Sequence, residues 1–273
     1  MPELPEVQSV VNHFKPYLLN QFIHSIDYLN NYEKVFETHS SNDLNKHVAN
    51  QKISKVWRRG KYIVIDVSNG HLCIHLRMTG QLQVGCNKTD NTNHFTALIN
   101  LKNKSKIYFK DYRKFGRIYF FKDLSILNYR LGPEPFDPNF NLTYVFEFFK
   151  GKNKDIKSFL LDQKFVSGIG NIYASEILFL SKINPCKKVS VLSKKECQKI
   201  ILNSKKILLK AIAKGGSSIR DFKDTSGSKG GFQNEFKVYQ QEGKKCKNLG
   251  CFDLIKKKII GNRSTFFCDS CQK

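Results

Sequence analysis

The chain has 273 residues, which is enough for two domains of ordinary size, each with its own core. Hydrophobic residues make up 40 % and aromatic residues 12 % of the chain, which indicates packed globular structure; no run of about 18 apolar residues could span a bilayer. Its 46 lysines and arginines against 23 aspartates and glutamates leave a net charge of +23, so a polyanion, nucleic acid first, is the expected partner. The alternative is that mutational drift filled a solvated surface with lysine and asparagine.

The N-terminal segment "MPELPEVQSVV" lacks the basic and long apolar regions of a targeting peptide. Apolar residues then recur at helical spacing from Val7 to Leu18. Pro5 suits the first turn of a helix, and the Glu6 carboxylate complements its positive end. The pattern predicts a helix over residues 5–19.

A series of short β-rich runs follows from Phe22 to Lys122. Turn residues and an Asn/Thr-rich tract at 87–94 separate the runs "FIHSIDYL", "VWRRGKYIVIDVS", "HLCIHLRM", "FTALINL", "KIYFKD" and "RIYFF". This region is typical of an antiparallel sandwich or barrel. The stretch "LGPEPFDPNF" at 131–140 holds three prolines, which neither a helix nor a central strand tolerates, so we place a domain boundary there.

Beyond the boundary the period becomes helical, so the second domain is expected to be mainly α. The longest helix is predicted to start at a cap on Ser193 and to end at the glycine pair Gly215 and Gly216. The Gly/Ser-rich stretch "TSGSKGGFQ" at 225–233 is interpreted as a mobile loop that could cover a ligand.

The eight cysteines divide into two groups. Without a secretory signal a reducing compartment is expected, so disulfides are not predicted, and Cys73, Cys86, Cys186 and Cys197 are interpreted as small buried residues. The last four show the spacing C-x4-C, sixteen residues, C-x2-C, which indicates one structural Zn²⁺ held by four thiolates; four free cysteines are the alternative. The zinc ligands would be Cys246, Cys251, Cys268 and Cys271.

Seven blocks of sequence, in order over almost the whole chain, resemble bacterial formamidopyrimidine-DNA glycosylase. They are "MPELPEV", "RRGKY", "HLRMTG", "DYRKFG", "LGPEP", "GIGNIYASE" and the terminal cysteine hairpin. The resemblance implies an α+β fold: an N-terminal helix with an antiparallel β-sandwich, then a helical domain with a helix–two-turn–helix motif and a zinc-finger β-hairpin. The expected divisions are 1–130, a linker at 131–138, 139–238 with the lid loop, and 239–273.

The resemblance also gives the first residues a chemical role. It implies that Met1 is removed and that the secondary amine of Pro2 attacks C1′ of a damaged nucleotide. An α-amine titrates near pH 8, so a useful neutral fraction exists at physiological pH, and a secondary amine forms an iminium directly. Glu3 would exchange protons with the opening sugar. For this segment alone, the alternative is that its prolines stiffen the terminus and its glutamates cap the helix.

Two cations and three wedge residues are assigned by the same matching. Lys61 would donate a proton in β-elimination, and Arg263 would assist δ-elimination; the alternatives are an exposed strand lysine and an ordinary exposed arginine. Met78, Arg113 and Phe115 match side chains that fill the gap left by the extruded base. From their residue types alone, Met78 and Phe115 would be assigned to the core.

The remaining DNA contacts lie mostly in the second half. Asn171, at a turn leading into a helix, is an expected phosphate ligand, and Lys157 and Lys152 are further candidates whose alternative is a surface lysine. Glu176 is expected to orient this turn or to contact the lesion site. His94 falls near a DNA-contacting histidine of the family.

Three positions depart from the family pattern. The first cysteine pair is C-x4-C where the family usually has C-x2-C, so Cys246 could be displaced by a residue or two without loss of the site. Arg77 replaces a glycine, and Arg220 replaces the usual lysine before the lid. These two changes put the lesion preference in doubt and leave the chemistry intact.

The resemblance implies a bifunctional glycosylase and abasic-site lyase that excises 8-oxoguanine and formamidopyrimidines from duplex DNA. It would act as a monomer, without membrane attachment, in a cytoplasm where it associates with the nucleoid; a bacterial source is expected. The alternatives are an endonuclease VIII-like enzyme for oxidised pyrimidines and a zinc-containing DNA-binding protein without catalysis.

Overall fold

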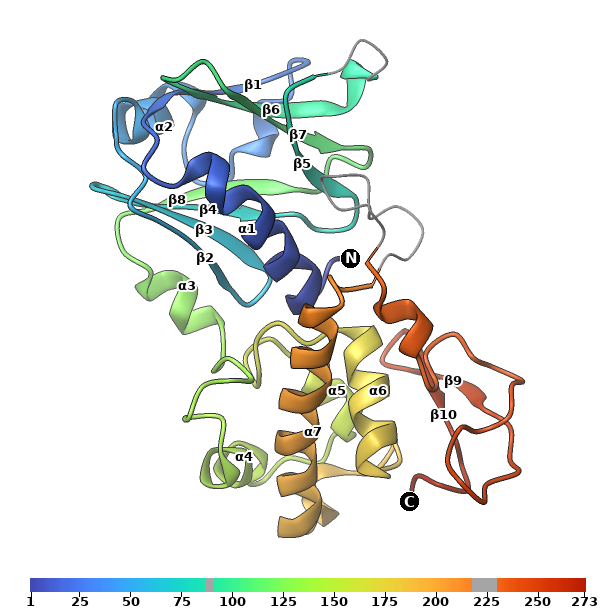
Figure 1. Cartoon of the computed structure of the whole chain (residues 1–273). Helices are drawn as coiled ribbons and strands as arrows, with labels where there is room; N and C mark the ends of the chain where they lie inside the picture. Colours follow the sequence, from blue (N-terminus) through green and yellow to red (C-terminus); the bar gives the residue numbers. More distant parts are fainter. Residues whose placement is uncertain (87–90, 218–229) are drawn as a thin grey trace. The chain divides into compact units, whose positions relative to one another are not determined.

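The computed structural model describes residues 1–86, 91–217 and 230–273 (Figure 1). Over these residues the contacts divide the chain into two compact units. Unit 1 comprises Met1–Asn128 with Ser217–Gly230, and unit 2 comprises Tyr129–Gly216 with Gly231–Lys273. Within the described ranges, no helix combines the length and apolar character needed to cross a membrane.

Unit 1 is built from two four-stranded antiparallel sheets and the helices around them (Figure 1). Its elements are α1 (Leu4–Leu18), β1 (Ile23–Tyr28), η1 (Glu33–Val35), α2 (Ser41–Val48), β2 (Lys55–Arg59), β3 (Tyr62–Val67), β4 (Gly70–His75), β5 (Gly80–Val84), η2 (Thr92–His94), β6 (Phe95–Leu101), β7 (Lys106–Asp111), β8 (Arg117–Phe121) and the first part of α3 (Ser125–Arg130). The strand orders are β1-β6-β7-β5 and β2-β3-β4-β8, and neighbouring strands in both sheets are antiparallel.

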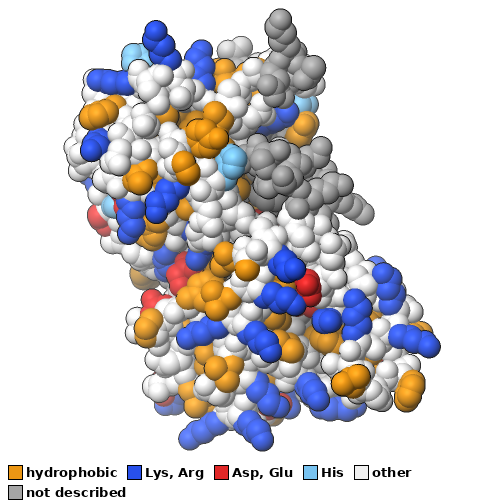
Figure 2. Space-filling model, viewed as in Figure 1, with side chains coloured by type: hydrophobic (Ala, Val, Ile, Leu, Met, Phe, Trp, Pro, Cys, Tyr) orange, Lys and Arg blue, Asp and Glu red, His pale blue; other side chains and the backbone are white. Residues whose placement is uncertain are grey.

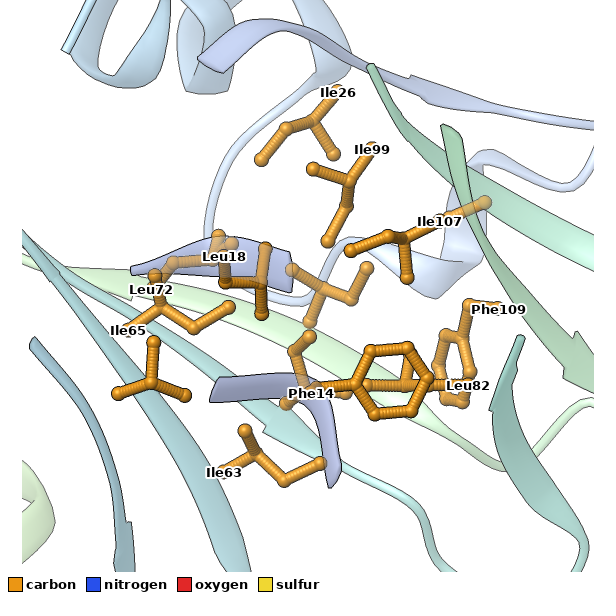
Figure 3. Packing of buried hydrophobic residues seen from close by; sticks show 14 of the residues in the cluster. Phe14, Leu18, Ile26, Ile63, Ile65, Leu72, Leu82, Ile99, Ile107 and Phe109 are labelled. Atoms are coloured by element: carbon orange, nitrogen blue, oxygen red, sulfur yellow. The ribbon is translucent and has the colours of Figure 1, made fainter. Parts of the chain in front are cut away.

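The two sheets and α1 share one hydrophobic core (Figure 3). Phe14 and Leu18 of α1 lie among Ile63, Ile65 and Leu72 of one sheet and residues of the other, which include Ile26, Leu82, Ile99, Ile107 and Phe109. Alternation along each strand brings these side chains to the inner faces, as a sandwich requires. The predicted sandwich is therefore confirmed.

Helix α1 begins and ends within one residue of the predicted range 5–19. Pro5 lies in its first turn, and the apolar residues spaced three and four apart are buried on the core side. The helix ends at Leu18, because the next residue already has an extended backbone. The hydrophobic period thus predicted both the position of this helix and the face that it buries.

The predicted run "VWRRGKYIVIDVS" is a hairpin of two strands rather than one strand. Arg59 at the end of β2 pairs with Tyr62 at the start of β3, which leaves Gly60 and Lys61 as a two-residue loop. Gly60 has φ of 56°, which glycine adopts without steric cost at the first position of such a turn. The hairpin places Lys61 at its tip.

Unit 2 is mainly helical, with a two-stranded hairpin near the C-terminus (Figure 1). Its elements are the end of α3, α4 (Leu142–Phe149), α5 (Ile156–Leu161), α6 (Asn171–Ser181), η3 (Val189–Val191), α7 (Lys194–Ala213), η4 (Phe232–Glu235), β9 (Lys256–Ile260) and β10 (Arg263–Phe267). Helix α6 contacts α5, α7 and β10. The Ser193 hydroxyl accepts a hydrogen bond from the Glu196 N–H, which confirms the predicted cap of α7.

Several tight turns use asparagine in the left-handed backbone conformation. Among the described residues, ten non-glycine positions have positive φ, and five of them are asparagines: Asn20, Asn30, Asn31, Asn50 and Asn262. Asparagine tolerates this conformation better than most side chains, so these turns need no glycine.

Two predictions about loops and cysteines need correction. Cys86, just after β5, is exposed and Cys186, in a turn, is half-buried, whereas Cys73 and Cys197 are buried as predicted. Part of the predicted lid loop at 225–233 is helical: Phe232 and Gln233 begin the 3-10 helix η4. Residues 225–229 of the lid, Arg220 and residues 87–90 of the Asn/Thr-rich tract lie outside the described residues.

Phe14 provides a test of the shared core. Phe14→Ala removes a fully buried ring between the two sheets, so we expect the free energy of unfolding to fall by about 3 to 5 kcal/mol. Tyr17→Ala, on the exposed side of the same helix, should cost less than about 1 kcal/mol. Urea unfolding of the full chain followed by circular dichroism measures both; equal losses would contradict the assignment of Phe14 to the core.

Candidate functional site

The start of α1 is held by a buried carboxylate. Glu6 Oε2 accepts a hydrogen bond from the Glu3 N–H at 2.8 Å. Glu6 Oε1 accepts two more, from the Ser217 N–H at 2.7 Å and from the Ser217 hydroxyl at 2.9 Å. Pro2 and Glu3 are buried as well. The interpretation that Glu6 caps the helix is therefore correct, and the same bond fixes the peptide that follows Pro2.

Lys61 is only 5 % exposed, so the alternative of an exposed strand lysine is wrong. Burial lowers the pKa of His75 to about 3, and the positive charges of Arg77 and Lys61 act in the same direction. His75 is therefore neutral at physiological pH, and its Nδ1 accepts a hydrogen bond from the Arg77 N–H at 3.1 Å. On the other side of the hairpin, Arg58 donates to Gln8 of α1 at 3.1 Å. The hairpin tip thus combines a buried cation with a neutral imidazole beside the first half of α1.

Arg77 occupies a backbone conformation that favours glycine. Its φ is 52°, in the left-handed region. A non-glycine residue in this region is strained, which explains why a glycine is expected at this position. Arginine in place of the family's glycine therefore strains the backbone at this position. It also adds a positive charge beside His75.

The predicted wedge residues extend from two loops that Asp111 joins. The carboxylate of Asp111, fully buried at the end of β7, accepts hydrogen bonds from the Thr79 hydroxyl, the Arg113 N–H at 3.1 Å and the Gly116 N–H at 2.6 Å. A side chain at Gly116 would overlap the ring of Phe109. One carboxylate therefore sets the conformation of both loops.

Met78 and Phe115 are exposed, so their assignment to the core from residue type is wrong. The Arg113 guanidinium lies 4.8 Å from the centre of the Phe115 ring, within the range of a cation–π contact. Both loops are rigidly held, and they present one apolar, one aromatic and one cationic side chain to solvent. His94, the nearby predicted contact, lies against the Tyr112 ring with ring centres 4.5 Å apart.

In unit 2, a chain of hydrogen bonds connects two of the predicted DNA contacts, Lys157 and Asn171. Lys157 Nζ donates to the Ser175 hydroxyl at 2.8 Å, and that hydroxyl donates to the Asn171 carbonyl at 3.0 Å. Asn171 Nδ2 then donates to the Ser264 carbonyl at 2.9 Å, next to Arg263 in the sequence. Asn171 Oδ1 is buried, and among the described residues it has no hydrogen-bond partner. The network ties α5, α6 and β10 together.

The two predicted lysines differ in environment. Lys157 is 0 % exposed, so it is not a surface lysine, and its role toward DNA stays a prediction. Lys152 is half-buried, with Nζ 3.5 Å from the centre of the Phe148 ring. The cation–π contact with Phe148 restricts the position of this ammonium group at the protein surface.

Glu176 orients the segment before the cysteine hairpin. Its buried carboxylate accepts hydrogen bonds from the backbone N–H groups of Lys237, Val238 and Tyr239, at 2.8 to 3.2 Å. Burial raises the pKa of Glu176 above its ordinary value, although these hydrogen bonds act in the opposite direction. The segment that Glu176 orients is therefore 237–239 and not the turn before α6 for which this role was expected, and contact with the lesion site stays a prediction.

The four C-terminal cysteines form one cluster. Their sulfur atoms all lie within 4.8 Å of one another, and the pairs Cys246–Cys271 and Cys251–Cys268 are 3.8 and 3.7 Å apart. A tetrahedral ion with Zn–S bonds of about 2.3 Å places neighbouring sulfurs about 3.8 Å apart. The residues therefore fit a structural zinc ion, and Cys246 is not displaced by the four-residue spacer.

Basic side chains are spread over the face shown in Figure 2, where acidic ones are sparse. A model of the formamidopyrimidine-DNA glycosylase N-terminal domain matches residues 1–118, and a model of the H2TH domain of the same enzyme matches residues 131–223. The chain belongs to the formamidopyrimidine-DNA glycosylase family.

Curated relatives match over the full length. The formamidopyrimidine-DNA glycosylase of Pelotomaculum thermopropionicum is 35 % identical over 278 residues and covers 100 % of this chain and 99 % of its own. That of Mycoplasma genitalium is 37 % identical and covers 100 % and 96 %.

Solved structures of the family agree with the fold. A Lactococcus lactis Fpg mutant in complex with Fapy-dG-containing DNA matches with a TM-score of 0.89 and 33 % identity, covering 100 % of both chains. MutM in complex with carbocyclic 8-oxo-G-containing DNA matches with a TM-score of 0.88 and 34 % identity, again over 100 % of both chains. The predicted α+β fold, DNA glycosylase family and zinc site are therefore confirmed.

Sequence reasoning missed Asp111 and His75 as individual residues, although it quoted the blocks that contain them. Asp111 ends a strand immediately before a turn, a position where a carboxylate commonly accepts backbone hydrogen bonds, and this signal was available. The burial of His75 beside Lys61 depends on the pairing of β3 with β4, which no local pattern reveals.

Removal of one ligand tests the zinc site. Cys246→Ser should lower the zinc content well below one ion per chain, because three thiolates hold the ion less tightly, and should lower the midpoint of thermal unfolding. Cys186→Ser, outside the cluster, should change neither quantity. Elemental mass spectrometry and thermal unfolding measure the two effects; full zinc content in the Cys246 variant would exclude Cys246 as a ligand.

Proposed function

We propose that this protein excises oxidised purines, 8-oxoguanine and formamidopyrimidines, from duplex DNA and then cleaves the strand, with Pro2 as the nucleophile after removal of Met1. Family membership supports this proposal, as do the similar structures that contain DNA with Fapy-dG or carbocyclic 8-oxo-G. Excision and strand cleavage would both proceed through one covalent intermediate on the proline nitrogen.

The observation that carries the proposal is the burial of the residues at the start of α1. Most chain ends fray, but here Glu6 fixes the Glu3 N–H, and both Pro2 and Glu3 are buried. A nucleophile gains in rate when it is held in one orientation, because the entropy of positioning is lost during folding and not during reaction. The cap therefore supports a catalytic role for this terminus.

The proposed reaction begins when the Pro2 lone pair forms a bond to C1′ and the bond from C1′ to the base breaks. The base leaves with a proton, the sugar ring opens with proton exchange at Glu3, and the resulting iminium withdraws electrons from C2′. Loss of a C2′ proton then expels the 3′ phosphate, and a second elimination expels the 5′ phosphate. Water finally releases the proline amine and the sugar fragment.

We assign Lys61 to the phosphate of the damaged nucleotide and to proton donation during β-elimination. Its neighbour His75 is neutral at physiological pH, so it adds no second positive charge beside Lys61 and offers one N–H and one acceptor. Because the Arg77 N–H already occupies Nδ1, the imidazole N–H lies on Nε2. Lys61 is thus the cation of this pair.

Met78, Arg113 and Phe115 are proposed to fill the space that an extruded base leaves in the duplex. Extrusion costs a few kcal/mol of unstacking, which inserted apolar and planar groups partly offset. The exposure of all three residues, on loops that Asp111 holds, supports this role, because an apolar side chain exposed on a rigid loop needs a ligand to cover it. His94 is proposed as a further DNA contact.

In unit 2, Asn171, Lys152 and Arg263 are proposed to bind backbone phosphates, with Arg263 also assisting δ-elimination. Asn171 Nδ2 carries two donors and Ser264 uses one, which leaves the second for a phosphate oxygen. Lys157 would act through Ser175 to position Asn171, since its own ammonium group is buried. We also propose that the protein acts as a monomer in the bacterial cytoplasm, in association with the nucleoid; its curated relatives are bacterial.

Borohydride trapping tests the nucleophile and the lesion class together. With a duplex that contains one 8-oxoguanine opposite cytosine, reduction should link the DNA to the peptide that begins at Pro2, as identified by mass spectrometry. Pro2→Gly should reduce the trapped fraction by about tenfold or more while binding of the duplex changes little. A duplex with 5-hydroxycytosine should be trapped less efficiently.

Preferential trapping on the oxidised pyrimidine would instead assign the protein to the endonuclease VIII type. Absence of trapping on both duplexes, from a protein whose intact mass shows a free Pro2, would indicate a DNA-binding protein without catalysis.

The product pattern tests Arg263. Because Arg263 is assigned to δ-elimination as well as to phosphate binding, Arg263→Ala should slow the second cleavage by about tenfold or more relative to the first, so that the β-elimination product accumulates. Lys195→Ala, an exposed cation on α7, should leave the ratio of the two products unchanged. Denaturing gels of an end-labelled duplex separate the products; equal slowing of both eliminations would show that Arg263 acts only in binding.

A further inference from the structure

Helix α7 exposes two leucines on the side opposite to the core. Its buried residues recur at spacings of three and four and form one stripe, which comprises Cys197, Ile200, Ile201, Ser204, Leu208 and Ala211. Leu202 and Leu209, 56 % and 57 % exposed, fall on the other side of the helix. Seven residues, or about 10.5 Å along the helix axis, separate them, so they lie nearly in line. Burial of these leucines against a ligand would recover free energy that they lose in water.

Exposed lysines continue the line of the two leucines. Lys195, Lys199 and Lys206 are all exposed, and with Leu202 and Leu209 they follow one another at alternating spacings of four and three residues. This is the spacing of the seam along which two helices of a coiled coil meet. Figure 2 shows orange and blue side chains close together over the region where Figure 1 places α7. We call these five residues the α7 outer face.

The charge of α7 selects the ligand. The helix contains six lysines and one acidic residue, Glu196, which already forms an ion pair with Lys187 at 2.7 Å. Within the described part of the chain, the three lysines of the α7 outer face form no ion pair. A second copy of this face would bring like charges together, so a dimer through α7 is disfavoured and an acidic ligand is favoured.

The α7 outer face points away from the DNA contacts proposed in unit 2. The buried side of α7 packs against α4 and α6, and α6 in turn contacts β10, where Asn171 donates to the Ser264 carbonyl beside Arg263. Figure 1 shows α6 between α7 and the β9–β10 hairpin. Lys152 lines a pocket together with Cys197, a residue of the buried stripe. Unit 2 can therefore hold DNA on one side and a different ligand on the outer face of α7.

We propose that the α7 outer face binds an acidic amphipathic helix of a partner protein, whose apolar side chains pack against Leu202 and Leu209 and whose carboxylates pair with the three lysines. Two helices that pack lengthwise meet through rows of side chains that repeat every three and four residues, as this face does. The leucines supply affinity, and the lysines select the partner by charge. The backbone of a duplex would pair with the lysines but leave both leucines uncovered, so the leucines favour a helix over DNA.

The probe is a fluorescein-labelled helical peptide of about three heptads, with leucine and glutamate at the seam positions and alanine or glutamine elsewhere. Fluorescence anisotropy with the zinc-loaded full chain should show saturable binding, and a scrambled peptide of the same composition should bind about tenfold more weakly or worse. Leu202→Gln combined with Leu209→Gln, which keeps the helix propensity, should weaken binding by about tenfold or more. Leu249→Gln combined with Phe252→Gln removes two exposed apolar side chains outside α7 and should not alter binding. Circular dichroism and thermal unfolding verify that the variants fold.

Charge reversal tests the choice of partner. Lys199→Glu combined with Lys206→Glu should abolish binding of the acidic peptide and create binding of a peptide with lysine in place of glutamate. Lys244→Glu combined with Lys245→Glu changes the net charge equally outside α7 and should do neither. Equal binding of the ordered and scrambled peptides, or unchanged binding in the double leucine variant, would overturn the proposal. Displacement of the peptide by an undamaged duplex, or by vesicles of anionic lipid that the double leucine variant no longer binds, would assign the face to DNA or to a membrane surface instead.

Discussion

Buried carboxylates that accept hydrogen bonds from backbone N–H groups hold the loops of this protein in place. Glu6 binds the N–H groups of Glu3 and Ser217, Asp111 binds those of Arg113 and Gly116, and Glu176 binds three successive ones at residues 237–239. A carboxylate buried without such partners would cost several kcal/mol, so each loop conformation and its carboxylate depend on each other. Replacement of any of the three would leave several N–H groups without an acceptor.

This arrangement explains how a chain of strongly positive charge can keep its reactive groups ordered. Acidic residues are few, yet three of them, Glu6, Asp111 and Glu176, are buried and bind backbone N–H groups instead of surface lysines. The cations are consequently left to face an external polyanion. Lys61 and Lys157 are exceptions, because both are buried, and Lys157 is held by a hydroxyl that connects it to Asn171. The protein thus separates the groups that build the site from those that attract DNA.

Local patterns in the sequence were sufficient for features that depend on neighbouring residues. The apolar period predicted α1, Ser193 predicted the start of α7, and cysteine spacing predicted the metal cluster. Burial was predicted poorly, because it depends on which strands pair: Lys61 was expected at the surface from its type alone, and Met78 and Phe115 in the core. Only the family resemblance assigned those three residues to a site, and it did not reveal Asp111, which holds two of them.

The asparagines in left-handed turns bear on how far such a sequence can diverge. A chain under pressure to accumulate asparagine can accept it where the backbone already demands positive φ, at little cost to the folded state and with less flexibility in the unfolded state than glycine would bring. Substitutions of this kind change the sequence without moving the strands that the turns connect. They are one physical reason why a protein that shares about a third of its residues with its relatives can retain their backbone almost unchanged.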